Sequence, residues 1–265
     1  MGFGVIIIGD EILSGRRQDK HLGKAIELLS ARGFALSWAR YVGDDPALIQ
    51  RELKAAFESD DIVFSFGGIG ATPDDHTRAC AANALGQALV LHPEAAELIL
   101  ERSREMAAQE GKPFVESDPE IQRRLNMGRL PIGATLIPNP YNRIPGFSIG
   151  GRVHFLPGFP VMAWPMMEWV LDHCHTGVEA QPVWREKSVI VFDGLESRLS
   201  PLMEAVEQRF PGIKVFSLPS VDHPQYGKHI DLGVKGPDES LEQAFEALMQ
   251  GLIEIGASTG PVLVR

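Results

Sequence analysis

Short apolar runs alternate with amphipathic stretches over the first 66 residues, and this alternation constrains the fold more than any other feature. The apolar runs read as strands over residues 3–8, 34–42 and 61–66. Between them, residues 19–33 and 44–60 place apolar side chains at helical spacing. A strand–helix–strand–helix–strand order at this spacing requires parallel strands joined by right-handed crossovers. The predicted fold class is therefore α/β, built in layers.

The segment after the third strand continues the same domain. Residues 74–127 stay helical in pattern, with a break at residues 111–113, whereas residues 130–160 are crowded with Pro and Gly. Short apolar runs within that second segment predict short strands and functional loops. Residues 161–174 predict an apolar helix that closes the domain.

The chain is predicted to form a larger domain at residues 1–178 and a smaller α+β domain at residues 179–265. Residues 175–184 have the composition of a linker, and the pattern after them reads strand–helix–strand–strand–helix. Over residues 181–265 there are 8 Lys and Arg against 12 Asp and Glu, and no G-x-x-G loop lies between the first helices. Phosphate affinity would lack its main source there, so we expect domain or subunit packing instead of RNA binding.

The charge and cysteine content narrow the classes of partner. A net charge of −10 repels nucleic acid and anionic membrane surfaces, and no apolar run is long enough to span a bilayer. Two cysteines are too few for a disulfide framework and suit a reducing cytoplasm. We therefore expect a cytoplasmic protein with no nucleic-acid or membrane partner.

A glycine-rich turn follows the third predicted strand, in the stretch SFGGIGATPDDHTR at residues 65–78. Gly67, Gly68 and Gly70 allow positive φ and let backbone N–H groups approach a bound anion. The following helix adds partial positive charge at its N-terminus, so phosphate is the natural ligand. The alternative is a plain turn in which Asp74 or Asp75 serves as the helix N-cap.

A second acidic pair, Asp10 and Glu11, follows the first predicted strand. Parallel strands bring both acidic clusters to the same sheet edge, where they would repel phosphate unless a divalent cation such as Mg²⁺ lay between them. Backbone donors for phosphate and carboxylates for a cation suit chemistry at a pyrophosphate. The alternative for this pair is capping and solvation.

Five motifs together carry a family resemblance. GDEILSG followed by Asp19, then GGIGATPDD, PNPYNRIPG and LPGFP occur in the order and approximate spacing of the molybdopterin-binding (MoaB/MogA-like) domain. The form is most similar to the N-terminal part of competence/damage-inducible protein A (CinA). Residues after 178 resemble the small KH-like middle domain of CinA and not its C-terminal amide hydrolase domain.

The resemblance implies a three-layer α/β/α domain with its site at the glycine-rich loop. It implies a catalytic Asp75 and Asp10, and a metal held by Asp10, Glu11 and Asp75. The substrate-binding positions that it implies are Gly67, Gly68, Gly70, Thr72, Asp74, Asp19, Asn139, Gly146, Pro157 and Gly158. Mg²⁺ or another divalent cation is the expected cofactor, and molybdopterin is a further candidate ligand.

Two functions follow from the resemblance. The first is a divalent-metal-dependent hydrolase of nucleotide pyrophosphates such as ADP-ribose, and the alternative is a non-catalytic molybdopterin-binding or molybdenum-cofactor biosynthesis protein. Ile69 stands where the adenylyltransferases have Thr, which argues against molybdopterin adenylylation. His21 replaces an expected Asn and Phe159 replaces the Pro of CinA, so the choice of ligand stays open.

Three other features of the sequence favour a structural role. The DHCH stretch at residues 172–175 does not predict a zinc site, because adjacent residues of a helix point in different directions. Cys80 is predicted to be a small buried residue and not a nucleophile. The apolar helix at residues 161–170, together with the family resemblance, predicts a homo-oligomer, either a dimer or a trimer.

Overall fold

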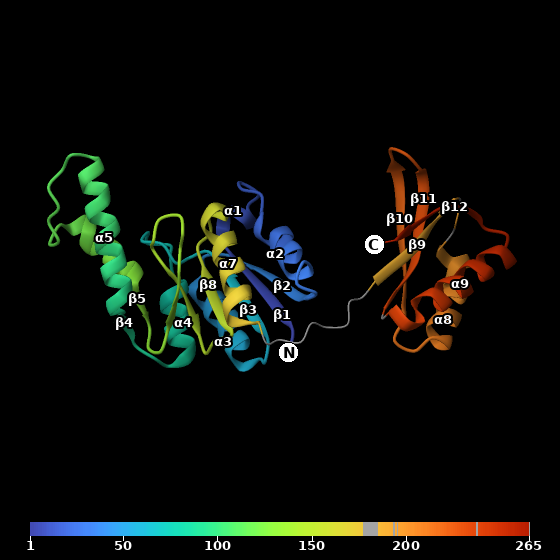
Figure 1. Ribbon diagram of the computed structural model, residues 1–265, viewed down its shortest axis with the longest axis horizontal. Coiled ribbons are helices and arrows are strands. Elements are labelled where there is room, and N and C mark those ends of the chain that lie inside the picture. The colour runs from blue at the N-terminus through green and yellow to red at the C-terminus, as the bar shows by residue number, and fades with distance from the viewer. Residues whose placement is uncertain (177–184, 193, 195, 237, 265) are drawn as a thin grey trace. The chain divides into compact units, whose positions relative to one another are not determined.

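The computed structural model describes residues 1–176, 185–192, 194, 196–236 and 238–264 (Figure 1). The chain forms two compact units, residues 1–179 and 180–265. The predicted boundary between residues 178 and 179 lies outside the described residues. Each unit is considered by itself below.

The first unit is built on a six-stranded sheet with the order β2-β1-β3-β8-β7-β6. Its strands are β1 (Phe3–Ile8), β2 (Leu36–Val42), β3 (Ile62–Phe66), β6 (Thr135–Ile137), β7 (Gly146–Ile149) and β8 (Val153–Leu156). The four strands β2, β1, β3 and β8 are parallel, and β7 and β6 continue the sheet antiparallel. The predicted α/β class with a parallel core is therefore confirmed.

Helices cover both faces of this sheet and complete three layers. They are α2 (His21–Ser30) and α7 (Pro160–Cys174) on one face, and α3 (Pro46–Glu58) and α4 (Thr77–Leu85) on the other. Alternate residues of one strand supply the two cores: Val5 and Ile7 pack on the first side, Ile6 and Ile8 on the second. Strand β1 is buried on both faces for this reason.

The segment between α4 and β6 lies outside the main sheet. Its elements are β4 (Leu89–Leu91), α5 (Pro93–Gln109), α6 (Pro119–Leu125), the 3₁₀ turn η1 (Asn126–Gly128) and β5 (Arg129–Pro131). Strands β4 and β5 pair antiparallel beside the main sheet, and α5 extends from them (Figure 1). The sequence pattern predicted the helices of this segment but not its two short strands.

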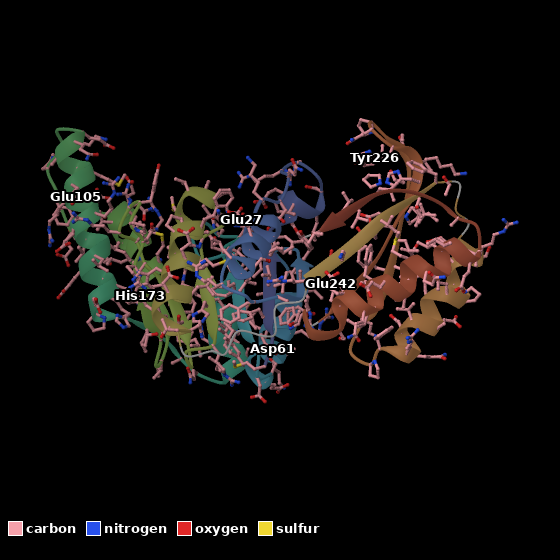
Figure 2. The ribbon with its side chains drawn as sticks, turned by 45° about the vertical axis from the view of Figure 1, so that its right-hand side comes forward. Glu27, Asp61, Glu105, His173, Tyr226 and Glu242 are labelled. Carbon is pink, nitrogen blue, oxygen red and sulfur yellow. The ribbon has the colours of Figure 1, made fainter. Side chains whose placement is uncertain are left out.

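The second unit is a smaller α+β domain with an antiparallel sheet in the order β10-β11-β9-β12. Its elements are β9 (Arg185–Phe192), α8 (Glu196–Arg209), β10 (Lys214–His223), β11 (Gly227–Gly236), α9 (Asp238–Glu254) and β12 (Ser258–Val264). Both helices pack on one face of the sheet. The Lys187 ammonium donates a hydrogen bond to the Glu242 carboxylate and so links β9 to α9. Tyr226 lies at the β10–β11 turn (Figure 2). The prediction missed β12.

Helix α7 is apolar because it belongs to the core of its own unit. Met166, Met167 and Val170 are each at most 1% exposed, so these side chains offer no patch to another subunit. Val161 is 53% exposed at the start of the helix. The burial of α7 removes the apolar-helix argument for a homo-oligomer, which stays a prediction. Cys80 is 2% exposed, as expected of a small core residue.

Within the described residues, no helix combines the length and apolar character needed to cross a membrane.

Candidate functional site

A cavity of about 410 Å³ lies where the parallel strands β1, β3 and β8 end. The glycine-rich loop at residues 67–72 forms one wall, and residues 157–159 after β8 form another. Asn139 and Asn142 contribute from the loop before β7. Ligand sites in open α/β folds collect at this edge because several loops converge there.

The glycines of the loop are required by the packing of the protein itself. Gly67 and Gly68 have φ of 99° and 69°, a region that favours glycine. A Cβ at Gly67 would overlap the carbonyl oxygen of Ile8, and one at Gly68 would overlap the Thr77 hydroxyl. The positive φ expected of Gly67 and Gly68 is confirmed, and these contacts within the protein require glycine at both positions whether or not a ligand approaches.

The loop that lines the cavity carries unpaired backbone donors. Among the described residues, no hydrogen-bond partner exists for the backbone N–H groups of Gly68, Ile69 and Ala71, all of which line the cavity. Neighbouring carbonyl groups are occupied, since the Arg78 guanidinium donates to Ile69 and Gly70 oxygens, the second at 2.6 Å. The loop is therefore arranged to receive an acceptor-rich ligand such as a phosphate.

Arg78, on α4, places a positive charge directly behind this loop. It is 8% exposed, and burial lowers the pKa of its guanidinium, while the nearby Asp75 raises it. Buried arginine is rare unless paired, and here its fork bonds two backbone carbonyls. The sequence analysis missed Arg78, because only the folded loop brings residues 69 and 70 to it.

Asp75 is used by the loop as an internal acceptor. Its Oδ1 accepts the N–H of Gly70 at 2.8 Å, and its Oδ2 accepts both the N–H and the hydroxyl of Thr72 at 2.8 and 2.5 Å. The N–H groups that it satisfies lie upstream, in the turn itself, and not in helix α4. Asp75 thus braces the turn, a role distinct from both the predicted metal ligand and the predicted helix N-cap.

A cluster of carboxylates forms the acidic edge of the cavity. Asp10 and Asp44 exchange bonds, with Asp10 N–H donating to Asp44 Oδ2 at 2.9 Å and Asp44 N–H donating to Asp10 Oδ1 at 3.1 Å. Glu11, Asp44 and Asp74 line the cavity. The pKa of Asp44 is raised, and burial is the largest cause. The hydrogen bond from the Asp10 N–H lowers this pKa, whereas the charges of three nearby carboxylates raise it further: Asp10, Glu11 and Asp74.

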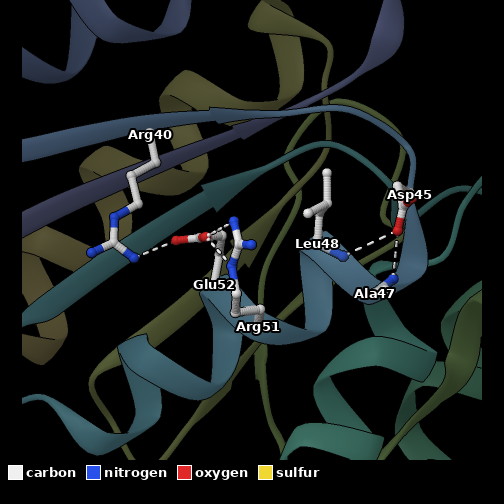
Figure 3. A network of polar contacts seen from close by, with 6 residues as sticks. All are labelled: Arg40, Asp45, Ala47, Leu48, Arg51 and Glu52. Carbon is white, nitrogen blue, oxygen red and sulfur yellow. Dashed lines mark hydrogen bonds and ion pairs between the residues drawn. The ribbon is translucent and has the colours of Figure 1, made fainter.

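Asp44 is a site residue that the sequence could have revealed. Strand β2 runs parallel beside β1, with Val42 opposite Ile8, so the residues after both strands share one edge. Asp10 was predicted to lie at this edge because it follows a parallel strand, and the same reasoning applies to Asp44. Asp45 then caps α3 by accepting the N–H groups of Ala47 and Leu48, and Glu52 pairs with Arg40 and Arg51 (Figure 3).

The predicted metal ligands do not form a metal site in the described residues. There, no group of three or more His, Cys, Asp or Glu side chains is placed to hold a metal ion. Asp75 is committed to the loop, and Asp10 is not among the residues that line the cavity. The metal set Asp10, Glu11 and Asp75 therefore stays a prediction, with Asp75 already bonded within the loop.

The other predicted positions divide into lining and supporting residues. Asn139, Pro157 and Gly158 line the cavity; the Asn139 amide donates to Asn142 Oδ1 at 2.8 Å and to the Ile144 carbonyl at 2.9 Å. Asp19 and Gly146 lie outside the lining, as Asp10 does.

Asp19 supports the start of α2 and the end of β2. It accepts the N–H groups of His21 and Leu22 and the hydroxyl of Tyr41. Burial first, and then this bond to Asp19, raise the pKa of Tyr41 to about 12. Gly146 lies in β7, where a Cβ would overlap the carbonyl of Phe155. Both residues shape the site from outside the cavity.

Arg17 stands at the mouth of the cavity and was also missed. Its guanidinium lies 3.4 Å from Glu11 Oε1, and its Cζ lies 5.7 Å from the centroid of the Phe159 ring. Its side chain is 54% exposed. An exposed cation in the lining would favour an anionic ligand.

Comparisons with known proteins show the family of the chain. The family described as "Probable molybdopterin binding domain" matches residues 4–175. A CinA-like protein of Syntrophotalea carbinolica is 30% identical over 221 residues, which cover 79% of this chain and 51% of that protein, so the match spans about half the length of that relative. A protein of Pyrobaculum calidifontis is 29% identical over 257 residues, covering 95% of this chain and 94% of that protein. The solved structure of the protein CinA from Thermoplasma acidophilum is similar with a TM-score of 0.55 and 28% identity, covering 65% of this chain and 97% of that one.

Proposed function

Because this chain belongs to the molybdopterin-binding domain family and is CinA-like, we propose that its cavity binds a phosphorylated small molecule and that the protein hydrolyses nucleotide pyrophosphates such as ADP-ribose. The observation that carries the binding half is the row of unpaired N–H groups at Gly68, Ile69 and Ala71. Hydrogen bonds from N–H groups to phosphate oxygens are charge-assisted and strong in a partly enclosed site.

Two arginines support this proposal from opposite sides. Arg78 holds positive charge behind the loop, and Arg17 holds it at the mouth. Together they offset the acidic edge formed by Glu11, Asp44 and Asp74. A pyrophosphate lying between loop and mouth would meet donors along its length, which suits a nucleotide diphosphate better than a neutral metabolite.

The hydrolytic half rests on the CinA resemblance. A divalent cation would neutralise the pyrophosphate and lower the pKa of an attacking water, as it does in metal-dependent hydrolysis. Because the described residues offer no site of three ligands, metal is a variable in the test and not an assumption.

A second candidate is a protein that binds molybdopterin without turning it over. The commitment of Asp75 to the bonds from Gly70 and Thr72 favours this candidate, because a carboxylate so occupied is poorly placed to orient water or metal. Phosphate recognition would be shared by both candidates, since molybdopterin also carries a phosphate.

The experiment has a binding arm and a turnover arm. Calorimetric titration with inorganic pyrophosphate and with ADP-ribose measures binding, and release of AMP from ADP-ribose is followed with Mg²⁺, Mn²⁺ or Co²⁺ and with chelator. AMP release with any one metal supports the hydrolase. Binding without AMP, together with co-purified pterin fluorescence, would favour the carrier, and absence of pyrophosphate binding would refute the phosphate site itself.

A further inference from the structure

A second, smaller cavity adjoins the one described above. Its volume is about 240 Å³. The two cavities share five lining residues: Ile8, Glu11, Arg17, Gly158 and Phe159. The rest of the smaller cavity is mainly apolar and aromatic, with the rings of Phe66 and His21 in its lining. A ligand whose phosphates contact the glycine loop therefore has room to extend into it.

Phe159 forms the part of the shared wall that a planar ligand would meet. Its side chain is 55% exposed, and it stands directly before Pro160, the first residue of α7. The guanidinium of Arg17 lies over its ring at 5.7 Å. A phenyl ring held at the wall of a cavity offers a stacking face to an aromatic heterocycle, and such stacking is sequence-tolerant and strong.

His21, which lines the same cavity, carries a buried hydrogen-bond acceptor that nothing uses among the described residues. It is 5% exposed, and its ring stacks on Phe66 with centroids 4.6 Å apart. Its Nε2 lies 3.1 Å from the carbonyl oxygen of Gly158; since a carbonyl only accepts, Nε2 carries the proton. Burial, the largest cause, lowers the pKa of His21, so the ring is neutral at pH 7 and Nδ1 is an acceptor. Nδ1 has no partner among the described residues.

We propose that the smaller cavity binds the planar nitrogen heterocycle of the ligand, a purine base or a pterin, stacked on Phe159 with an edge N–H donated to His21. This inference rests on the proposed phosphate site, because the ring and the phosphates belong to one molecule. Arg17 pairs loosely with Glu11 and is half exposed, so it is free to turn from Glu11 to the phosphate that joins the two parts.

Calorimetric titration of the full chain tests the stacking with four probes: inorganic pyrophosphate, ribose 5-phosphate, AMP and neopterin monophosphate. The better of the two ring-bearing probes is expected to bind about tenfold or more tightly than ribose 5-phosphate. Phe159→Ala is expected to remove most of that difference, measured as the ratio of the two affinities for the same variant, so that any change common to all probes cancels. Val161→Ala, at an equally exposed apolar residue of α7 outside the cavities, is the matched control.

The outcomes separate the stacking proposal from the phosphate site. Pyrophosphate that binds while all ring-bearing probes bind no better than ribose 5-phosphate overturns the stacking proposal alone. Phe159→Ala with an unchanged preference for the ring also overturns it, whereas absence of binding by every probe overturns both proposals. A preference for AMP identifies the ring as a purine, and a preference for neopterin monophosphate identifies it as a pterin.

The role of His21 has its own comparison. Purine riboside 5′-monophosphate has the ring of AMP without the exocyclic amine, so it lacks the N–H that His21 Nδ1 would accept. It is expected to bind several-fold more weakly than AMP to the native chain, and His21→Phe is expected to abolish that difference while keeping a ring against Phe66. Equal affinity of the two nucleotides for the native chain would overturn the role of His21.

Discussion

His154 and His175 are hydrogen-bonded to each other in the interior of the first unit, with their Nε2 atoms 2.8 Å apart. His154 is fully buried and its Nδ1 lies 2.6 Å from the hydroxyl of Ser148. One Nε2 must donate and the other must accept, so the contact requires that at least one of the two rings be neutral. Burial, and then the neighbouring His175, lower the pKa of His154 to about 3; burial also lowers the pKa of His175.

This pair predicts a loss of stability in mild acid. The unfolded chain takes up protons near pH 6.5, whereas folded His154 resists them until about pH 3, so the stabilisation is complete above pH 6.5 and declines as the pH falls from there. Each pH unit in that window lowers the free energy of unfolding by up to about 1.4 kcal/mol for one such group. Urea titrations from pH 7.5 to 4.5 should give a shallower dependence for His154→Gln than for the native chain. The exposed His173→Gln should keep the native slope, and equal slopes for all three would contradict the prediction.

Asp75→Asn is expected to loosen the glycine loop. An Asn amide retains one acceptor but points a donor at Thr72, so the bonds to Oδ2 are lost. We expect a loss of about 1–2 kcal/mol in the free energy of unfolding together with weaker pyrophosphate binding. Thermal melts and calorimetry measure the two effects, with Asp60→Asn, at an exposed aspartate outside the cavity lining, as the control. An unchanged melting temperature with abolished turnover would instead support a direct catalytic role for Asp75.

Arg78→Lys is expected to separate charge from geometry. The ammonium keeps a positive charge behind the loop but cannot donate as a fork to the Ile69 and Gly70 carbonyls. Pyrophosphate affinity should fall several-fold for Arg78→Lys and further for Arg78→Met, because one or both carbonyls lose their donor. Arg16→Lys, at an exposed arginine, should bind pyrophosphate as the native chain does. Full affinity in Arg78→Met would show that the loop holds its shape without the arginine.

Asp44→Asn is expected to change the response to divalent cations. The raised pKa of Asp44 reflects burial and repulsion from the carboxylates of Asp10, Glu11 and Asp74. Asn at position 44 removes the charge of Asp44 from this cluster, and its side-chain oxygen can still accept the Asp10 N–H. Metal-free pyrophosphate should bind several-fold more tightly to this variant at low ionic strength. Any gain in affinity that Mg²⁺ gives the native chain should shrink. Identical titrations of the two proteins, with and without Mg²⁺, would refute an electrostatic role for the acidic edge.

The oligomeric state has a separate measurement. The family resemblance predicts a dimer or a trimer, while the burial of Met166 and Met167 removes the apolar helix as its cause. Light scattering over a hundredfold range of concentration distinguishes the states, because the chain has a mass of 29.0 kDa. A constant monomer mass would rule out the predicted assembly.

Local pattern was enough to predict the layered half of the first unit. Strands β1, β2 and β3 are continuous apolar or alternating runs, and α2 and α3 carry helical spacing, so each element agrees with its own sequence. Strands β4 and β5 have three residues each, too few for a period to be read, and β12 contains the breakers Gly260 and Pro261. Those strands are specified by the partners that they pair with.

The candidate site was likewise predictable only where local sequence determines the position of a residue. The glycine loop and the edge position of Asp10 and Glu11 follow from where strands end, and Asp44 would have followed from the same rule. The internal bonding of Asp75 and the inward turn of Arg78 depend on distances that exist only once the loop has closed. Sequence order could therefore place the residues at the correct edge but could not say which carboxylates remain available to a ligand.

The bonds from Arg78 and Asp75 hold the glycine loop in one shape before any ligand arrives. The conformational entropy of that loop is therefore lost when the protein folds and not when it binds. If the proposed phosphate site exists, its contacts are already preorganised, so even a fragment as small as inorganic pyrophosphate should retain much of the binding free energy of a larger ligand. The same rigidity limits how far the loop can adapt, which leaves discrimination between ligands to the walls around it.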